Sequence, residues 1–120
     1  MNKSSLRNIA TKVINLEIDA LRILKKSIDK NFDKAVNTIV NCQSKIILCG
    51  VGKSGLIAAK IASTLSSVGS PAFSLSANDC LHGDLGSITK KDVLILISNS
   101  GKSEEIIPII KFANRNKIKL

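Results

Sequence analysis

Aromatic side chains are almost absent from this chain of 120 residues, which contains three Phe, no Tyr and no Trp. A protein that binds single-stranded nucleic acid commonly stacks the bases on aromatic side chains, and such a platform is missing here. Hydrophobic residues, mostly aliphatic, make up 44% of the chain, and charged residues make up 22%. This balance is typical of a folded globular protein, and the length allows one domain.

Metal-ligating residues are also scarce: the chain has one His and three Cys, without the C-x-x-C spacing of a zinc site. We therefore expect no metal, no cofactor, and free thiols at Cys42, Cys49 and Cys80. No apolar run reaches the eighteen or so residues of a membrane span. Polar residues also interrupt the N-terminal segment, so it has no signal-peptide core. These absences predict a cytoplasmic protein that binds no membrane.

Acidic residues are half as numerous as basic ones, which gives a net charge of +9. The excess is spread evenly: residues 1–45 carry nine Lys and Arg against four acids, and residues 46–120 carry nine against five. Because no dense basic run exists, a solvated surface explains the charge better than a nucleic-acid site. We expect no nucleic-acid partner. A basic surface would also attract a small anionic substrate.

The spacing of apolar residues predicts two N-terminal helices followed by alternating strands and helices. The first helix is expected over residues 5–28, and Asn31 is the expected N-cap of the second, which runs to Val40. Strands are expected at 45–50, 72–76 and 93–98, with another opening at 118–120, and helices at about 54–67 and 103–114. Such an alternation predicts an α/β fold with a parallel sheet and right-handed crossovers.

Two of the expected strands end in loops rich in Gly and Ser, and each loop opens a helix. They read GVGKSG over residues 50–55 and SNSGKS over residues 98–103. Helix N-termini offer unpaired N–H groups to anions, and open α/β sheets bind ligands at the carboxyl ends of their strands. The candidate binding residues are Gly52, Ser54, Gly55, Ser98, Asn99, Ser100, Gly101 and Ser103.

The first loop also matches parts of two better-known motifs. It has the GxGxxG spacing of dinucleotide-binding domains, but no acid follows the next strand before Asp79. It contains the Gly-Lys-Ser of a P-loop, but Ile47 stands where that motif needs Gly. For both loops, ordinary turns with Ser at the helix cap and Gly in the turn stay open as the alternative.

Three side chains close to these loops are candidates for chemistry. His82, the only His, lies in an expected loop beside Gly83, where functional residues gather, although a lone His is commonly structural. Glu105 lies near the start of an expected helix. Its carboxylate is placed either to interact favourably with the helix dipole or to transfer a proton. Lys53 is either a solvated loop charge or a cation directed at sugar oxygens.

Three segments together resemble the sugar isomerase (SIS) domain of the arabinose-5-phosphate isomerase family: GVGKSGLIAAKIASTLSSVGSPAF, HGDLGSIT and SNSGKSEEI. The resemblance runs from about residue 45 to residue 120. It implies a flavodoxin-like α/β domain of three layers, with a parallel sheet in the order 2-1-3-4-5. Residues 1–44 would then form a helical arm, and residues 45–120 a partial phosphosugar-binding domain.

This resemblance also implies a reaction, the interconversion of D-ribulose 5-phosphate and D-arabinose 5-phosphate through an enediol, a step toward the Kdo sugar of lipopolysaccharide. In that reading Glu105 acts as the base, and Lys53 or His82 polarises the carbonyl oxygen. The phosphate would be held by Ser54, Ser98, Ser100 and Ser103. The resemblance further implies a homo-oligomer.

The chain departs from the family pattern at several positions. Ser76, Ala77 and Asp79 stand where the family usually has His, Pro and Glu, and Lys102 stands where an acid is usual. The resemblance implies two further strands and a pair of CBS modules, which these 120 residues do not contain. We therefore expect a truncated domain that is inactive or feeble alone. The alternative function is a non-catalytic phosphosugar-binding module or the remnant of a truncated isomerase gene.

Overall fold

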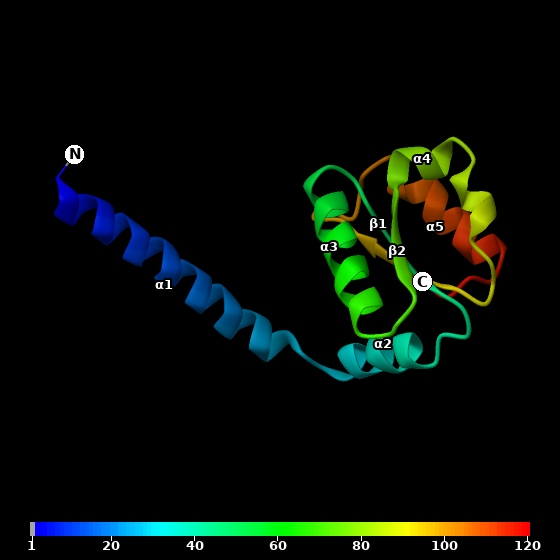
Figure 1. Ribbon diagram of the computed structural model, residues 1–120, viewed down its shortest axis with the longest axis horizontal. Coiled ribbons are helices and arrows are strands. Elements are labelled where there is room, and N and C mark those ends of the chain that lie inside the picture. Colours follow the sequence, from blue (N-terminus) through cyan, green and yellow to red (C-terminus); the bar gives the residue numbers. More distant parts are fainter. Residues whose placement is uncertain (1) are drawn as a thin grey trace. The chain divides into compact units, whose positions relative to one another are not determined.

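The computed structural model describes residues 2–120, and the chain divides into two compact units, Met1–Val36 and Asn37–Leu120. The first unit contains α1 (Lys3–Ser27) and the beginning of α2 (Lys30–Val40) (Figure 1). The Asn2 side chain caps α1 by accepting a hydrogen bond from the Ser4 amide. The domain boundary expected at residues 44 and 45 stays a prediction.

The N-terminus of α2 corrects one expectation. Asp29, and not Asn31, provides the side chain that caps this helix, since Asp29 Oδ1 accepts a hydrogen bond of 2.8 Å from the Asn31 amide. Both residues are good capping types, and the sequence alone does not decide between neighbours two positions apart.

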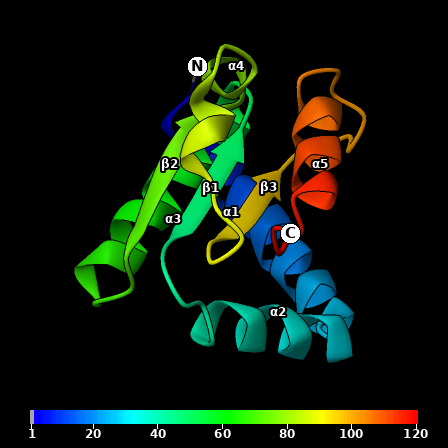
Figure 2. The same cartoon turned by 90° about the vertical axis from the view of Figure 1, so that its right-hand side faces the viewer.

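A parallel sheet of three strands forms the centre of the second unit (Figure 2). Its strands are β1 (Ile46–Gly50), β2 (Ala72–Ser76) and β3 (Val93–Ile97), in the order β2-β1-β3. Gly50 lies in register with Ser76 on one side and with Ile97 on the other, so the carboxyl ends of all three strands meet at one edge. An isolated parallel bridge between Val93 and Lys119 marks the expected opening of a further strand.

Helices cover both faces of the sheet, which makes the three layers that the family resemblance implies. Alternate residues of a strand point to opposite faces. Ile46 and Leu48 therefore pack on α3 (Lys53–Ser67) through Ala58 and Ala62. On the other face, Ile47 and Cys49 pack with residues of α4 (Ala77–Leu81) and α5 (Ile106–Arg115). Each face thus has its own apolar core.

Two expectations about helices are wrong. Residues 77–87 are not an open loop but contain α4 and a 3-10 turn, η1 (Asp84–Ser87). The last helix begins at Ile106 and not at about residue 103. Pro108 explains this start, since a residue without an N–H fits only the first turn of a helix.

Candidate functional site

A cleft of about 270 Å³ lies between the loops that follow β1 and β3. These strands are neighbours, and the chain leaves them toward helices on opposite faces of the sheet. Parallel α/β sheets bind ligands at such a switch point. The cleft is lined by Val51, Ser54, Ile97, Ser98, Asn99, Ser100, Ser103 and Ile106. The fold therefore brings the Gly-rich loop after β1 and the Ser-rich loop after β3 to a single cleft.

The loop after β3 holds its hydroxyl groups by hydrogen bonds from its own backbone. Ser98 Oγ accepts a bond of 2.9 Å from the Gly101 amide, and Ser100 Oγ accepts one of 3.2 Å from the Lys102 amide. Gly101 has a φ of 67°, which favours glycine. Because these oxygens accept from the backbone, their O–H protons can be donated to an anion in the cleft.

The loop after β1 depends on close contact between Gly50 and the first turn of α3. A Cβ on Gly50 would lie 2.6 Å from the backbone carbon of Ser54, closer than real Cβ contacts. Gly52 has a φ of 57°. These two glycines let the chain turn directly from β1 into α3. The turn places Ser54 against the cleft, at a helix end whose N–H groups favour anions.

Two of the candidate glycines belong to a second hollow, of about 260 Å³, on the other side of the β1 loop. Gly52 and Gly55 line it with Ser74 and Ser76, which come from β2 and its end. Sequence reasoning did not single out these two serines for binding, because a weak strand gives no motif. Gly101 shapes the loop after β3 and does not line the 270 Å³ cleft.

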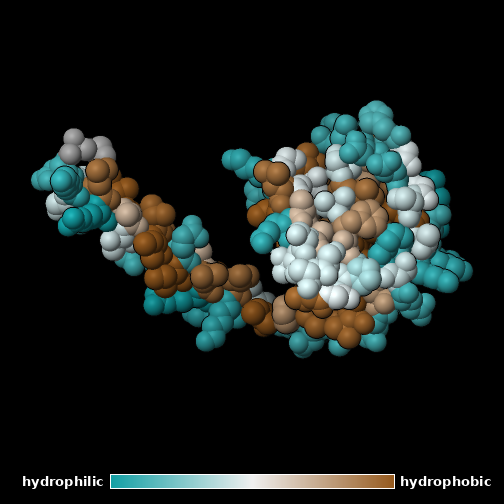
Figure 3. Space-filling view, in the orientation of Figure 1, coloured by the Kyte–Doolittle hydropathy of each residue, from teal (hydrophilic) through white to brown (hydrophobic). Residues whose placement is uncertain are grey.

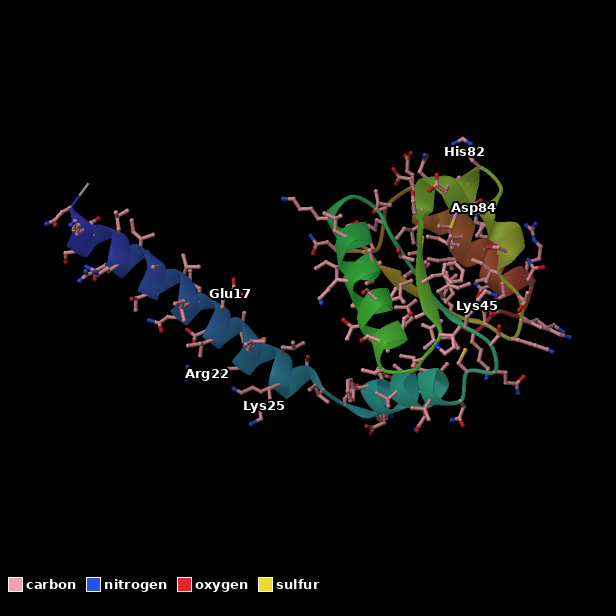
Figure 4. All side chains as sticks on the ribbon, viewed as in Figure 1. Glu17, Arg22, Lys25, Lys45, His82 and Asp84 are labelled. Atoms are coloured by element: carbon pink, nitrogen blue, oxygen red, sulfur yellow. The ribbon has the colours of Figure 1, made fainter. Side chains whose placement is uncertain are left out.

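The three candidates for catalysis lie near the cleft edge of the sheet but do not line this cleft. Lys53 is the first residue of α3 and is exposed. His82 follows α4, is exposed, and points away from the body of the domain (Figure 4). Glu105 directly precedes α5 and is half-buried. None of the three contributes to the lining of the cleft, and their catalytic roles remain predictions.

Apolar side chains form part of the cleft wall, and the sequence reasoning did not single them out. Val51, Ile97 and Ile106 line the cleft between its polar residues. Ile97 ends a buried strand and Ile106 begins α5, so their apolar character was already explained by the fold. Only the pairing of the two loops in space shows that they also line the cleft.

A pair of buried thiols lies beneath the site. Cys49 on β1 and Cys80 on α4 place their sulfurs 4.0 Å apart. Burial, followed by the proximity of Cys80, raises the pKa of the Cys49 thiol to about 12. Burial is also the main cause that raises the pKa of the Cys80 thiol. Both sulfurs are therefore neutral core atoms rather than nucleophiles.

No group of three or more His, Cys, Asp or Glu side chains within residues 2–120 is arranged to hold a metal ion. Within the same range, no helix combines the length and apolar character needed to cross a membrane.

The fold is that of a parallel α/β domain with a cleft at the carboxyl ends of two neighbouring strands, and comparison with known proteins gives its family. The SIS domain model matches residues 39–120, and the chain therefore belongs to the SIS domain family. It is 49% identical over 110 residues to arabinose 5-phosphate isomerase KdsD of Francisella tularensis, covering 87% of this chain and 34% of that protein. It is 41% identical over 106 residues to arabinose 5-phosphate isomerase GutQ of Escherichia coli, covering 88% of this chain and 33% of that protein.

A solved structure is also similar in fold. Protein c3406 of Escherichia coli CFT073, in complex with arabinose 5-phosphate, superposes with a TM-score of 0.91 at 36% identity, covering 98% of this chain and 63% of that one. The chain spans about a third of the length of the isomerases it matches. The parallel sheet and its flanking helices agree with this neighbour, so the expected SIS fold class is confirmed.

Proposed function

We propose that the chain binds a phosphorylated sugar, with the phosphate in the cleft between the β1 and β3 loops. The observation that carries this proposal is the convergence of Ser54, Ser98, Ser100 and Ser103 on one cleft. Hydroxyl donors and the N-terminus of α3 suit the oxygens of a phosphate monoester. The net charge of +9 favours the approach of such an anion.

Arabinose 5-phosphate is the sugar phosphate we propose. Two matched relatives are named arabinose 5-phosphate isomerases, and a structural neighbour is in complex with this sugar phosphate. The test is thermal unfolding of the purified chain with arabinose 5-phosphate, and with arabinose and inorganic phosphate as controls. A ligand that binds only the folded state raises the unfolding temperature, and above its dissociation constant the rise grows with the logarithm of its concentration. Stabilisation by arabinose 5-phosphate at lower concentrations than by either control supports the proposal, and equal effects of all three refute it.

The reaction that we propose for the complete site is aldose–ketose isomerisation between D-ribulose 5-phosphate and D-arabinose 5-phosphate, which would supply lipopolysaccharide synthesis. It moves a proton between C1 and C2 through an enediol and needs a base and a group that polarises the carbonyl oxygen. Glu105 is the proposed base, and Lys53 or His82 the proposed polarising group. The test is made in an active full-length relative, by changing the Glu that matches Glu105 to Gln. Normal turnover of that variant would exclude this Glu as the base.

A second candidate function is a phosphosugar-binding module without turnover. It is favoured by the exposure of Lys53 and His82 and by the absence of both from the lining of the cleft. A turnover assay on the purified chain separates the two, and we expect feeble or no isomerisation with binding retained. We propose no nucleic-acid partner. We do propose that the chain forms a homo-oligomer, because α1 has no buried residue.

A further inference from the structure

The two segments that follow β1 and β3 contain the same three residues in a row, Gly-Lys-Ser. They are Gly52-Lys53-Ser54 and Gly101-Lys102-Ser103. In each triplet the glycine has a positive φ, 57° at Gly52 and 67° at Gly101. In each triplet the serine lines the cleft. Both lysines therefore lie directly before a serine of the cleft wall, one in each of the two loops that flank the cleft.

Lys102 occupies a loop whose backbone is held by hydrogen bonds. Its amide donates the bond of 3.2 Å to Ser100 Oγ, and the amide of Gly101, directly before it, donates to Ser98 Oγ. The Lys102 side chain is exposed, and it forms no ion pair with a carboxylate of residues 2–120. The loop thus sets the backbone position of Lys102, while its ammonium on a flexible four-carbon stem stays available to an anion in the cleft.

Positive charge is scarce at the end of the sheet that carries the cleft. Figure 3 shows hydrophilic side chains over the end of the sheet domain that contains α4. The segments that follow the carboxyl ends of the strands, residues 51–54, 77–87 and 98–105, contain two lysines and four acidic residues. The lysines are Lys53 and Lys102, and the acids are Asp79, Asp84, Glu104 and Glu105. The basic excess of the whole chain lies elsewhere, and charges beyond a Debye length are largely screened from a phosphate bound here.

We propose that the ammonium of Lys102 binds the phosphate group of the sugar phosphate. The inference rests on the proposed function and adds a residue to its site. A phosphate monoester carries nearly two negative charges at neutral pH, and neutral hydroxyl donors leave these charges uncompensated. Of the two lysines at this end, Lys53 is proposed for the carbonyl oxygen of the sugar. Lys102 lies in sequence between Ser100 and Ser103, which both line the cleft, and is therefore the cation left for the phosphate.

The salt dependence of binding distinguishes an ion pair at Lys102 from a role in shaping the loop. Salt screens the attraction between an ammonium and a phosphate at the protein surface. The affinity of the unchanged chain for arabinose 5-phosphate should therefore fall as the NaCl concentration rises from about 50 mM to about 500 mM. In Lys102→Gln this fall should be smaller. A Lys102→Gln chain that binds more weakly but keeps the full salt dependence would overturn the ion pair.

The test is calorimetric titration of the unchanged chain, Lys102→Gln and Lys90→Gln with arabinose 5-phosphate. Lys90 is exposed and precedes the amino end of β3, whereas Lys102 follows the carboxyl end of that strand. Both variants lose one positive charge, but only Lys102→Gln loses it beside the cleft. We expect Lys102→Gln to raise the dissociation constant roughly fivefold to tenfold, and Lys90→Gln to change it less than about twofold. Equal dissociation constants of the two variants would overturn the assignment.

A variant that keeps the charge completes the test. Lys102→Arg should bind arabinose 5-phosphate within about threefold of the unchanged chain, because a guanidinium also pairs with phosphate. An affinity as low as that of Lys102→Gln would overturn the role of the charge. Since Lys90 and Lys102 are exposed, all variants without ligand should unfold at the temperature of the unchanged chain. An unchanged chain that does not bind arabinose 5-phosphate would refute the proposed function and this inference with it, whereas equal binding by Lys102→Gln and Lys90→Gln refutes this inference alone.

Discussion

The ammonium Nζ of Lys45 lies 3.0 Å from both carboxylate oxygens of Asp92, which is fully buried. Asp92 Oδ2 also accepts a bond of 2.7 Å from the Thr89 amide. Lys45 directly precedes β1 and Asp92 directly precedes β3, so the pair joins the amino ends of the two strands whose carboxyl ends flank the cleft. The labelled Lys45 lies at the end of the domain away from His82 (Figure 4).

The ionisation of Asp92 makes the stability of the fold depend on pH. Burial alone would raise the pKa of Asp92, but hydrogen bonds from Thr89, Ser44 and Lys45 lower it to about 2. A lowered folded-state pKa stabilises the fold above pH 4, and that stability is lost as the pH falls toward 2. We expect the free energy of unfolding to drop by about 2 kcal/mol across that window. Urea unfolding at pH 2 to 7 measures it.

Asp92→Asn should remove this dependence and cost roughly 3 kcal/mol at pH 7, since it breaks a buried ion pair. The matched control is Asp84→Asn, which changes an exposed carboxylate. An Asp92→Asn protein as stable as the control would contradict the structural role assigned to the pair.

The buried thiols predict an order of chemical modification. Cys42 is partly exposed, whereas Cys49 and Cys80 are buried and their pKa values are raised. Since alkylation needs a thiolate, iodoacetamide at pH 8 should modify Cys42 first and Cys49 at least about a hundredfold more slowly. Mass spectrometry of peptides from a time course gives the rates. In urea the three rates should converge, and fast native labelling of Cys49 would disagree with its position in the core.

Gly50 should be intolerant of a side chain. Its Cβ would lie 2.8 Å from the backbone nitrogen of Gly55, so Gly50→Ala must displace α3 from the end of β1. We expect a loss of about 1–3 kcal/mol, as for other overpacked cores. Gly86→Ala is the control, because nothing lies within 4 Å of the added carbon. Thermal unfolding of both variants decides, and equal stability would show that the β1–α3 contact tolerates the methyl group.

Removing hydroxyl groups from the cleft should weaken sugar phosphate binding. Hydrogen bonds to charged groups contribute about 1.5–3 kcal/mol, so Ser100→Ala should weaken arabinose 5-phosphate binding roughly tenfold or more. Ser98→Ala should do the same. Ser70→Ala is the matched control. It also removes a serine hydroxyl, but Ser70 lies before the amino end of β2, at the other end of the sheet from the cleft, so binding should be unchanged. Calorimetric titration of the three variants compares them, and similar affinities would move the phosphate away from this loop.

Much of the fold could be predicted because its signals are local. The runs Ile46–Gly50 and Val93–Ile97 are short and apolar and include β-branched Ile or Val, and a parallel sheet buries such strands on both faces. Helix α4 could not be predicted, because five residues of mixed polarity give no period. The start of α5 could have been predicted, since Pro108 fits only the first turn of that helix. The Ser and Glu residues before it imitate a capped helix start.

The candidate site divides in the same way. Ser98 and Ser100 follow directly from the loop sequence, and the strand order alone brings that loop to Ser54. The directions of Lys53 and His82 depend on turns that spacing does not describe. Gly83 has a φ of 124° next to His82, a conformation that no periodic pattern predicts.

Calorimetric titration of the purified chain with arabinose 5-phosphate, and with arabinose under the same conditions, tests the central proposal most directly. We predict saturable binding of one arabinose 5-phosphate per chain, with arabinose at least tenfold weaker because it lacks the phosphate. Equal affinity for both sugars, or no binding of arabinose 5-phosphate, would contradict the proposal.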